Sequence, residues 1–276
     1  MNNTLIAQLL ILFIITQSLG LVVGDFLVKE NIHSTIVTDN PEDVENSFGL
    51  IAWILLFTAA LLALFRFGSG WLISLVLKGA EVLAVFGTTI IVLLPFTESG
   101  LAILGLALLL VLSRILLSKN VFLRNVSSVV AAAGGGALVG ASLGVVPVIV
   151  FLVLLSVYDF IAVFKTKHMI TLAKGITKKN LSFTFAMPTK EHQFELGTGD
   201  MVVPLAFSVS VLASTKAVFA YPYYFVPSIA LLAASLAGLI ATVHYASLEK
   251  GRALPALPLQ AVLMLAVWLL VKLAGF

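Results

Sequence analysis

The fold is decided by the stretch VVPVIVFLVLLSVYDFIAVFK, residues 145–165. A membrane-spanning helix needs about 20 consecutive, mostly apolar residues, and this run is long enough to form one. Asp159 lies near its end, although a charge in hydrocarbon is costly and usually faces water or a partner. The stretch therefore predicts a spanning helix that carries a functional carboxylate.

The composition of the whole chain indicates a polytopic membrane protein. Of its 276 residues, 61% are hydrophobic and 11% are charged, whereas a soluble domain is roughly half apolar and about a quarter charged. The chain has no cysteine, which excludes disulfides and thiolate chemistry. Its basic residues are scattered over short loops, so the net charge of +3 predicts no nucleic-acid partner. Residues 1–23 lack the cationic start and the cleavage site of a signal peptide, and we expect them to remain as the first span.

We expect an all-α, multi-pass protein of the cell membrane with nine transmembrane helices. Apolar sequence runs almost unbroken over 126–164, and Gly144 with Pro147 supplies the break between two of these helices. The chain then divides into helices one to six (1–165), a cytoplasmic loop (166–199) and helices seven to nine (200–276). The predicted spans are 4–23, 49–66, 71–95, 100–118, 126–144, 145–165, 200–216, 223–244 and 254–274.

The distribution of basic residues predicts the orientation of the chain in the membrane. Cytoplasmic loops of membrane proteins carry an excess of Lys and Arg. If the N-terminus is cytoplasmic, 13 of the 16 Lys and Arg residues fall on the cytoplasmic side, and only Lys29, Lys216 and Lys272 do not. Nine spans then place the C-terminus on the extracytoplasmic side.

A second carboxylate, Asp200, opens the predicted seventh span. Asp159 lies six residues before Lys165 at the cytoplasmic end of the sixth span, which is about 9 Å deep at 1.5 Å per residue. The seventh span starts from the same side, so the two carboxylates reach similar depth. The segment before Asp200, residues 197–199, reads Gly-Thr-Gly, and such glycines can leave a helix start unwound. The alternative is an ordinary helix N-terminus, with the glycines in the entry loop and Asp200 as its cap or as a partner of the helix dipole.

Two carboxylates at one depth are compatible with two alternative functions, an aspartyl protease or an ion pathway. When they are close together they cannot both ionise easily, so they share one proton. One can act as a general base on water while the other, protonated, polarises a carbonyl, as in aspartyl proteases. Alternatively, the pair lines the proton or cation pathway of a transporter or leak channel. The chain has no His-Glu-x-x-His sequence, and we expect neither a metal nor another cofactor.

Three short motifs resemble those of the presenilin and signal-peptide-peptidase family of intramembrane aspartyl proteases. They are Tyr158-Asp159, Gly197-Thr198-Gly199-Asp200 and Pro255-Ala256-Leu257, on the sixth, seventh and ninth predicted spans. The resemblance covers essentially the whole chain, and the short loops and N-in orientation look most like an archaeal presenilin homologue. It implies that Asp159 and Asp200 are the catalytic pair. It also implies that the other motif residues shape the active site and help to admit the substrate.

The resemblance further implies the partners of the protein. The substrates would be transmembrane helices of other membrane proteins, cleaved near the cytoplasmic side within the lipid. No obligatory partner subunit is expected, and a homo-oligomer is left open. A helical substrate must be unwound before cleavage, and a strand edge offers one means. Residues 181–187 alternate with period two up to Pro188, which predicts such a strand; the alternative is a surface hairpin or an amphipathic loop.

Two further patterns predict how the helices pack. Gly136, Gly140 and Gly144 recur at four-residue spacing, which lets helix backbones approach closely. Lys78 and Glu81 are three residues apart on one helical face, a spacing that favours an ion pair over a proton relay.

Overall fold

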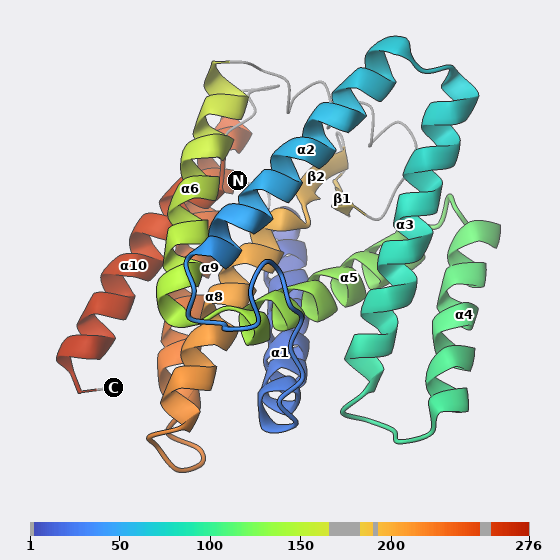
Figure 1. Cartoon of the computed structure of the whole chain (residues 1–276). Helices are drawn as coiled ribbons and strands as arrows, with labels where there is room; N and C mark the ends of the chain where they lie inside the picture. The colour runs from blue at the N-terminus through green and yellow to red at the C-terminus, as the bar shows by residue number, and fades with distance from the viewer. Residues whose placement is uncertain (1–2, 166–182, 190–192, 249–254, 276) are drawn as a thin grey trace.

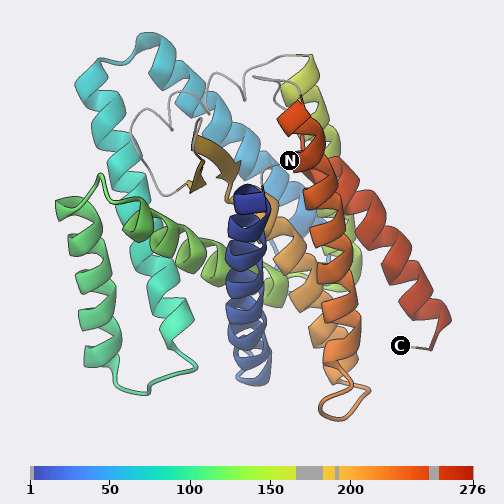
Figure 2. The same ribbon diagram turned by 180° about the vertical axis from the view of Figure 1, so that it is seen from behind.

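The computed structural model describes residues 3–165, 183–189, 193–248 and 255–275. These residues form nine helices and one two-stranded sheet, shown from opposite sides in Figures 1 and 2. The helices are α1 (Asn3–Lys29), α2 (Glu45–Phe67), α3 (Gly70–Leu93), α4 (Gly100–Leu116), α5 (Val121–Ser142), α6 (Val145–Phe164), α8 (Gly199–Lys216), α9 (Phe225–Leu248) and α10 (Leu257–Leu273). The strands are β1 (Thr184–Pro188) and β2 (Gln193–Gly197).

Each predicted span coincides with one helix. The break between the fifth and sixth spans lies at Gly144, the residue that precedes the first residue of α6. Among the described residues, six helices are long and apolar enough to cross a membrane, namely α1, α2, α3, α5, α6 and α9. Helices α4 and α10 are apolar but have 17 residues each, and α8 has 18. The count of nine spans therefore stays a prediction.

Helix α8 lies at the centre of the fold. Helices α1, α5, α6, α9 and α10 all pack against it, and every residue from 203 to 212 is buried. A helix that is apolar on all sides is typical of such a position. Helices α3 and α4 stand together at one side of the bundle, and α2 lies on the outside against α6 (Figure 1). The central helix is thus the one that begins beside Asp200.

Helices α5 and α8 are in close contact because α5 presents glycines to α8. A β-carbon at Gly140 would lie 2.5 Å from the backbone oxygen of Ala206, and one at Gly136 would lie 2.8 Å from the side chain of Leu205. These two positions confirm the packing predicted from the glycine spacing. The third glycine of the pattern, Gly144, has a different role: it lies against the carboxylate of Glu42.

Strands β1 and β2 form an antiparallel hairpin in which Thr184 is opposite Gly197. Strand β1 falls within the stretch of alternating residues that predicts a strand, of which residues 181–182 lie outside the described part. Alternation is typical of a half-buried strand, but residues 184–187 are all buried. The reason is that β1 packs against both α5 and α1. It is therefore an internal strand rather than a surface one.

The hairpin and the start of α1 lie at the same end of the bundle (Figure 1). Gln8 of α1 donates a hydrogen bond to the carbonyl of Pro188 at 3.2 Å. At the opposite end, the ammonium of Lys216 on α8 lies 2.5 Å from the carboxylate of Asp25 on α1. Helices α1 and α8 therefore run side by side in the same direction. The ion pair joins them at this end, and Gln17 of α1 donates to the carbonyl of Met201 near the start of α8.

Candidate active site

The carboxylates of Asp159 and Asp200 approach one another from α6 and α8. They are close enough for their charges to interact. Asp159 also accepts a hydrogen bond from the backbone N–H of Leu257, the first residue of α10. Three segments that are far apart in the sequence therefore meet at these two side chains. Within the described ranges, no group of three His, Cys, Asp or Glu residues could hold a metal ion, here or elsewhere.

Helix α8 begins directly after β2, at Gly199. Thr198 already has helical dihedral angles (φ −63°, ψ −27°), and Asp200 lies in the first turn. The prediction of an unwound helix start is therefore wrong here. The alternative of an ordinary helix N-terminus holds in part: Thr198 and not Asp200 occupies the N-cap position, but Asp200 lies in the first turn, where its carboxylate suits the helix dipole. The reason is the hairpin: both the N–H and the hydroxyl of Thr198 donate to the carbonyl of Phe183, each at 3.1 Å. These two bonds fix the point at which the helix begins.

The two glycines before Asp200 differ in what surrounds them. A β-carbon at Gly197 would lie 3.6 Å from Oδ2 of Asp200, so this glycine borders the carboxylate directly. A β-carbon at Gly199 would meet no atom within 4 Å, and Gly199 is exposed. Gly197 is thus the one of the pair whose missing side chain leaves space beside the carboxylate.

The remaining predicted site residues lie on α6 and at the start of α10. Tyr158 is half-buried and directly precedes Asp159 on α6. Pro255 is half-buried before α10, and Ala256 occupies the N-cap position of that helix and is buried. The segment 255–257 therefore brings the N–H of its last residue to Asp159.

Gln260 is a residue near this site that the sequence patterns did not single out. It lies one turn into α10 and is completely buried. Its side-chain amide donates to the backbone carbonyl of Asp200 at 3.3 Å, and it lies 3.3 Å from the hydroxyl of Ser235 on α9. An amide in an otherwise apolar span is a signal in the sequence that could have pointed to it.

Arg124 also has a role that its place in the sequence did not reveal. It contributes to the predicted cytoplasmic charge, yet it is 1% exposed. Its guanidinium pairs with Glu195 of β2 and donates to the hydroxyl of Thr184 on β1. The neighbouring Asn125 both donates to and accepts from the backbone of Ala186, each at 2.8 Å. The start of α5 therefore holds the hairpin that leads into Asp200.

A cavity of about 170 Å³ reaches Thr198 from between α3, α5 and α8. Its lining residues are Glu81, Ala84, Val85, Thr88, Ala131, Phe183, Thr198 and Val202. Because Thr198 is two residues from Asp200, this cavity borders the candidate site on the α3 side.

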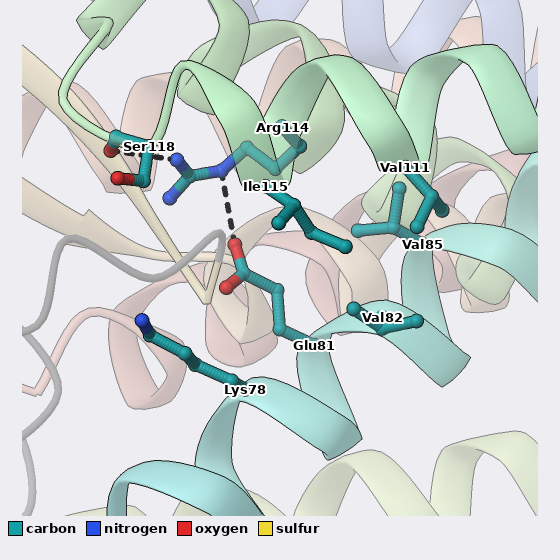
Figure 3. A pocket seen from close by; sticks show the side chains of 8 residues that line it. All are labelled: Lys78, Glu81, Val82, Val85, Val111, Arg114, Ile115 and Ser118. Carbon is teal, nitrogen blue, oxygen red and sulfur yellow. Dashed lines mark hydrogen bonds and ion pairs between the residues drawn. The ribbon is translucent and has the colours of Figure 1, made fainter.

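A second pocket, of about 50 Å³, lies on the other side of Glu81, between α3 and α4 (Figure 3). Its main polar feature is the ion pair between Oε1 of Glu81 and Nε of Arg114, at 3.0 Å, with both side chains nearly buried. The spacing along α3 named the wrong partner, Lys78, because the true partner comes from the next helix. This pocket is separate from the two aspartates and takes no part in the candidate site.

Comparisons with known proteins found one matching family and similar solved structures. The family described as "Signal-peptide peptidase, presenilin aspartyl protease" matches residues 10–275. Two solved structures of a presenilin family intramembrane aspartate protease have a similar fold. The one in space group C222 is 24% identical, with 94% of each chain covered and a TM-score of 0.65. The one in space group P2 is 24% identical, with 96% of each chain covered and a TM-score of 0.68. The comparison with curated protein sequences found no match.

Proposed function

Because the chain belongs to the signal-peptide peptidase and presenilin family of aspartyl proteases, we propose that it hydrolyses peptide bonds within transmembrane segments of other membrane proteins. The observation that carries this proposal is the approach of Asp159 and Asp200, with Leu257 of α10 bound to the first of them. No metal-ligand cluster competes for that role among the described residues. The family match gives no support to a transporter or channel that uses the same carboxylates.

The two aspartates act as one general acid–base pair in this proposal. The ionised member takes a proton from a water molecule as the water oxygen attacks the peptide carbonyl, and the protonated member donates a hydrogen bond to the carbonyl oxygen. Collapse of the tetrahedral intermediate then breaks the C–N bond, and the departing nitrogen takes up the proton that the first aspartate removed from the water, so that the pair again holds one proton. Since the reaction needs one proton on the pair, its rate should fall at both acidic and alkaline pH.

Strand β2 is the proposed docking edge for an unwound substrate. The opposite edge of the hairpin, along β1, is already occupied. Asn125 bonds both backbone groups of Ala186, Ser128 donates to the carbonyl of Thr184, and Gln8 donates to that of Pro188. A peptide strand therefore cannot add to β1 without displacing α5 and α1.

The outer edge of β2 remains open for an unwound substrate to dock as an added strand. In the antiparallel register, the residues opposite Thr184, Ala186 and Pro188 turn their backbone groups away from β1. In the same order, they are Gly197, Glu195 and Gln193. The described part of the chain offers their backbone groups no partner. An extended peptide that pairs here would lie beside Gly197, which borders the carboxylate of Asp200. Strand addition thus delivers an unwound peptide to the aspartates.

The proposed topology is nine spans in the cell membrane, with a cytoplasmic N-terminus and an extracytoplasmic C-terminus. The start of α1 and the hairpin lie at one end of the bundle, as this topology requires (Figure 1). Asp200 lies at that end too, because α8 begins there. Cleavage would then take place near the cytoplasmic end of the substrate helix.

The test uses the purified protein in proteoliposomes together with a transmembrane peptide. We expect Asp159→Asn and Asp200→Asn each to lower the cleavage rate by at least about 1,000-fold, since removal of one member of a catalytic unit disables the whole. The matched control is Asp39→Asn, which removes an exposed carboxylate in the α1–α2 loop. Full activity in either site variant would disprove the mechanism. Ion flux that depends on both aspartates, without cleavage, would favour the transporter.

A further inference from the structure

A proline interrupts the hydrogen bonding of α8 at Asp200. In an α-helix, the N–H of each residue bonds the carbonyl four residues earlier. Pro204 lies inside α8, four residues after Asp200, and proline has no N–H to donate. The carbonyl of Asp200 therefore has no helical partner. Because a buried carbonyl without a donor is costly, a neighbouring helix must supply one.

Gln260 of α10 supplies this donor. Its Nε2 lies 3.3 Å from the carbonyl oxygen of Asp200, and the side chain is completely buried. The next carbonyl of α8, that of Met201, receives a similar bond from Gln17 of α1 at 3.1 Å. Thus two buried amides from two different helices reach the two carbonyls that precede Pro204 by four and three residues. Both are the carbonyls that a proline disturbs in a helix.

Packing alone does not account for a glutamine at position 260. Leucine fills a similar volume without bringing a polar group into an apolar span, where an amide is costly. Moreover, the Oε1 of Gln260 is buried and has no partner in the described part of the chain. Only the amide nitrogen of this side chain makes hydrogen bonds within the described residues, to the carbonyl of Asp200 and to the hydroxyl of Ser235.

The first turn of α10 therefore contacts both aspartates. The N–H of Leu257 binds the carboxylate of Asp159, and Gln260, three residues later on the same helical face, binds the backbone of Asp200. We propose that Gln260 is a positioning residue, which holds Asp200 in place relative to Asp159 through the carbonyl that Pro204 leaves free. This inference rests on the proposed function, in which the two carboxylates act together.

The test compares Gln260→Leu in two backgrounds, the native chain and Pro204→Ala. In the native chain, we expect kcat for a transmembrane peptide to fall about 10- to 100-fold with KM nearly unchanged, because a small displacement of a catalytic group lowers the rate by this order. In the Pro204→Ala background, the alanine N–H bonds the carbonyl of Asp200. The same substitution should then lower kcat by less than about threefold, a departure from additivity typical of a shared interaction. Ser235→Ala is the matched control, since it removes the hydroxyl that Gln260 contacts on α9 but keeps the bond to Asp200, and it should leave kcat within about threefold.

The outcomes separate this inference from a general packing role. An equal loss of kcat in both backgrounds, or no loss in the native chain, overturns the proposal. If Gln260→Leu folds only in the Pro204→Ala background, the proposal is supported, because the restored bond replaces the amide. If it folds in neither, the cycle is repeated with Gln260→Met, and failure of that variant in both backgrounds overturns the proposal.

Failure of the proposed function gives a different result. In that case the unchanged protein cleaves no transmembrane peptide. The coupling between Pro204 and Gln260 is then measured from the thermal unfolding of the native chain, Gln260→Leu, Pro204→Ala and the double variant. A loss of Tm on Gln260→Leu that is equal in both backgrounds would overturn the positioning role, and a smaller loss in the Pro204→Ala background would support it.

Discussion

The carboxylate of Asp159 on α6 accepts a hydrogen bond from the backbone N–H of Leu257, the first residue of α10. The first N–H groups of a helix have no acceptor within the helix, so they readily bind an anionic group. Here that group is the side chain of a proposed catalytic residue. The segment 255–257 therefore affects Asp159 through its backbone, and its side chains matter mainly for placing α10.

Two substitutions at Leu257 distinguish the contribution of its backbone N–H to activity from that of its side chain. Leu257→Pro removes the N–H at the first position of α10, whereas Leu257→Ala keeps the N–H. Both variants lose packing of the buried leucine. We expect kcat of Leu257→Pro to be about tenfold below that of Leu257→Ala, since a hydrogen bond to a charged group is worth roughly 1.5–3 kcal/mol. Equal kcat values for the folded variants would show that the bond to Asp159 does not matter.

The ion pair between Arg124 and Glu195 should dominate the stability of the hairpin. Its side chains are only 2% and 17% exposed. Removal of one partner of a buried pair leaves an uncompensated charge, so Arg124→Met should lower the free energy of unfolding by about 3–5 kcal/mol. The double variant Arg124→Met/Glu195→Leu should regain most of this loss, as measured by denaturant unfolding in detergent. The control Lys119→Met removes an exposed charge near the same helix start. A double variant no more stable than the single one would contradict the role of the pair.

The open edge of β2 can be closed without breaking the hairpin. Gln193 turns its N–H away from β1, and proline is accepted at strand edges where the N–H has no partner. Gln193→Pro should therefore leave the protein folded but lower kcat/KM for a transmembrane peptide by about tenfold, the loss expected for one hydrogen bond. Phe194→Pro instead removes an N–H that faces β1 and should reduce Tm. Unchanged kcat/KM in Gln193→Pro would argue against strand addition at this edge.

Two glycines of α5 give a matched test of the contact between α5 and α8. At Gly140 a β-carbon would lie 2.5 Å from a backbone oxygen of α8, whereas at Gly135 it would meet nothing within 4 Å. Gly140→Ala should therefore lower the free energy of unfolding by about 1–3 kcal/mol, as overpacking does. Gly135→Ala should be neutral or stabilising by up to about 1 kcal/mol, because alanine favours helix. The comparison is made by thermal unfolding, and similar Tm values for both variants would refute the close contact.

The helices could be predicted from the sequence because their signal is local. An apolar run of sufficient length forms a helix wherever its neighbours lie, and Gly144 marked the break before α6 correctly. The first helix extends six residues beyond its predicted end at residue 23, to Lys29. The predicted span ended at residue 23, but the helix continues past Asp25, whose charge is compensated by Lys216, 191 residues away.

The partners of buried polar groups could not be predicted because they come from distant segments. Arg124 looked like an ordinary loop charge, since nothing near it in the sequence indicates that Glu195 will face it. Glu81 was given Lys78 as its partner because only neighbours on the same helix can be inferred from spacing. The amide of Gln260 stands out in an apolar span, but its link to Pro204 becomes visible only when α10 packs against α8.

The topology can be tested with single cysteines, since the chain has none of its own. With a cytoplasmic N-terminus, Glu98→Cys and Tyr223→Cys lie outside and should react with an impermeant maleimide in intact cells. Lys119→Cys and Gln193→Cys should react only after the cells are opened. All four residues are exposed. Reaction of Lys119→Cys and Gln193→Cys in intact cells, without reaction of Glu98→Cys and Tyr223→Cys, would mean that the orientation is inverted. Reaction of both Glu98→Cys and Lys119→Cys from outside would mean that α4, with its 17 residues, does not cross the membrane, and the count of nine spans would be wrong.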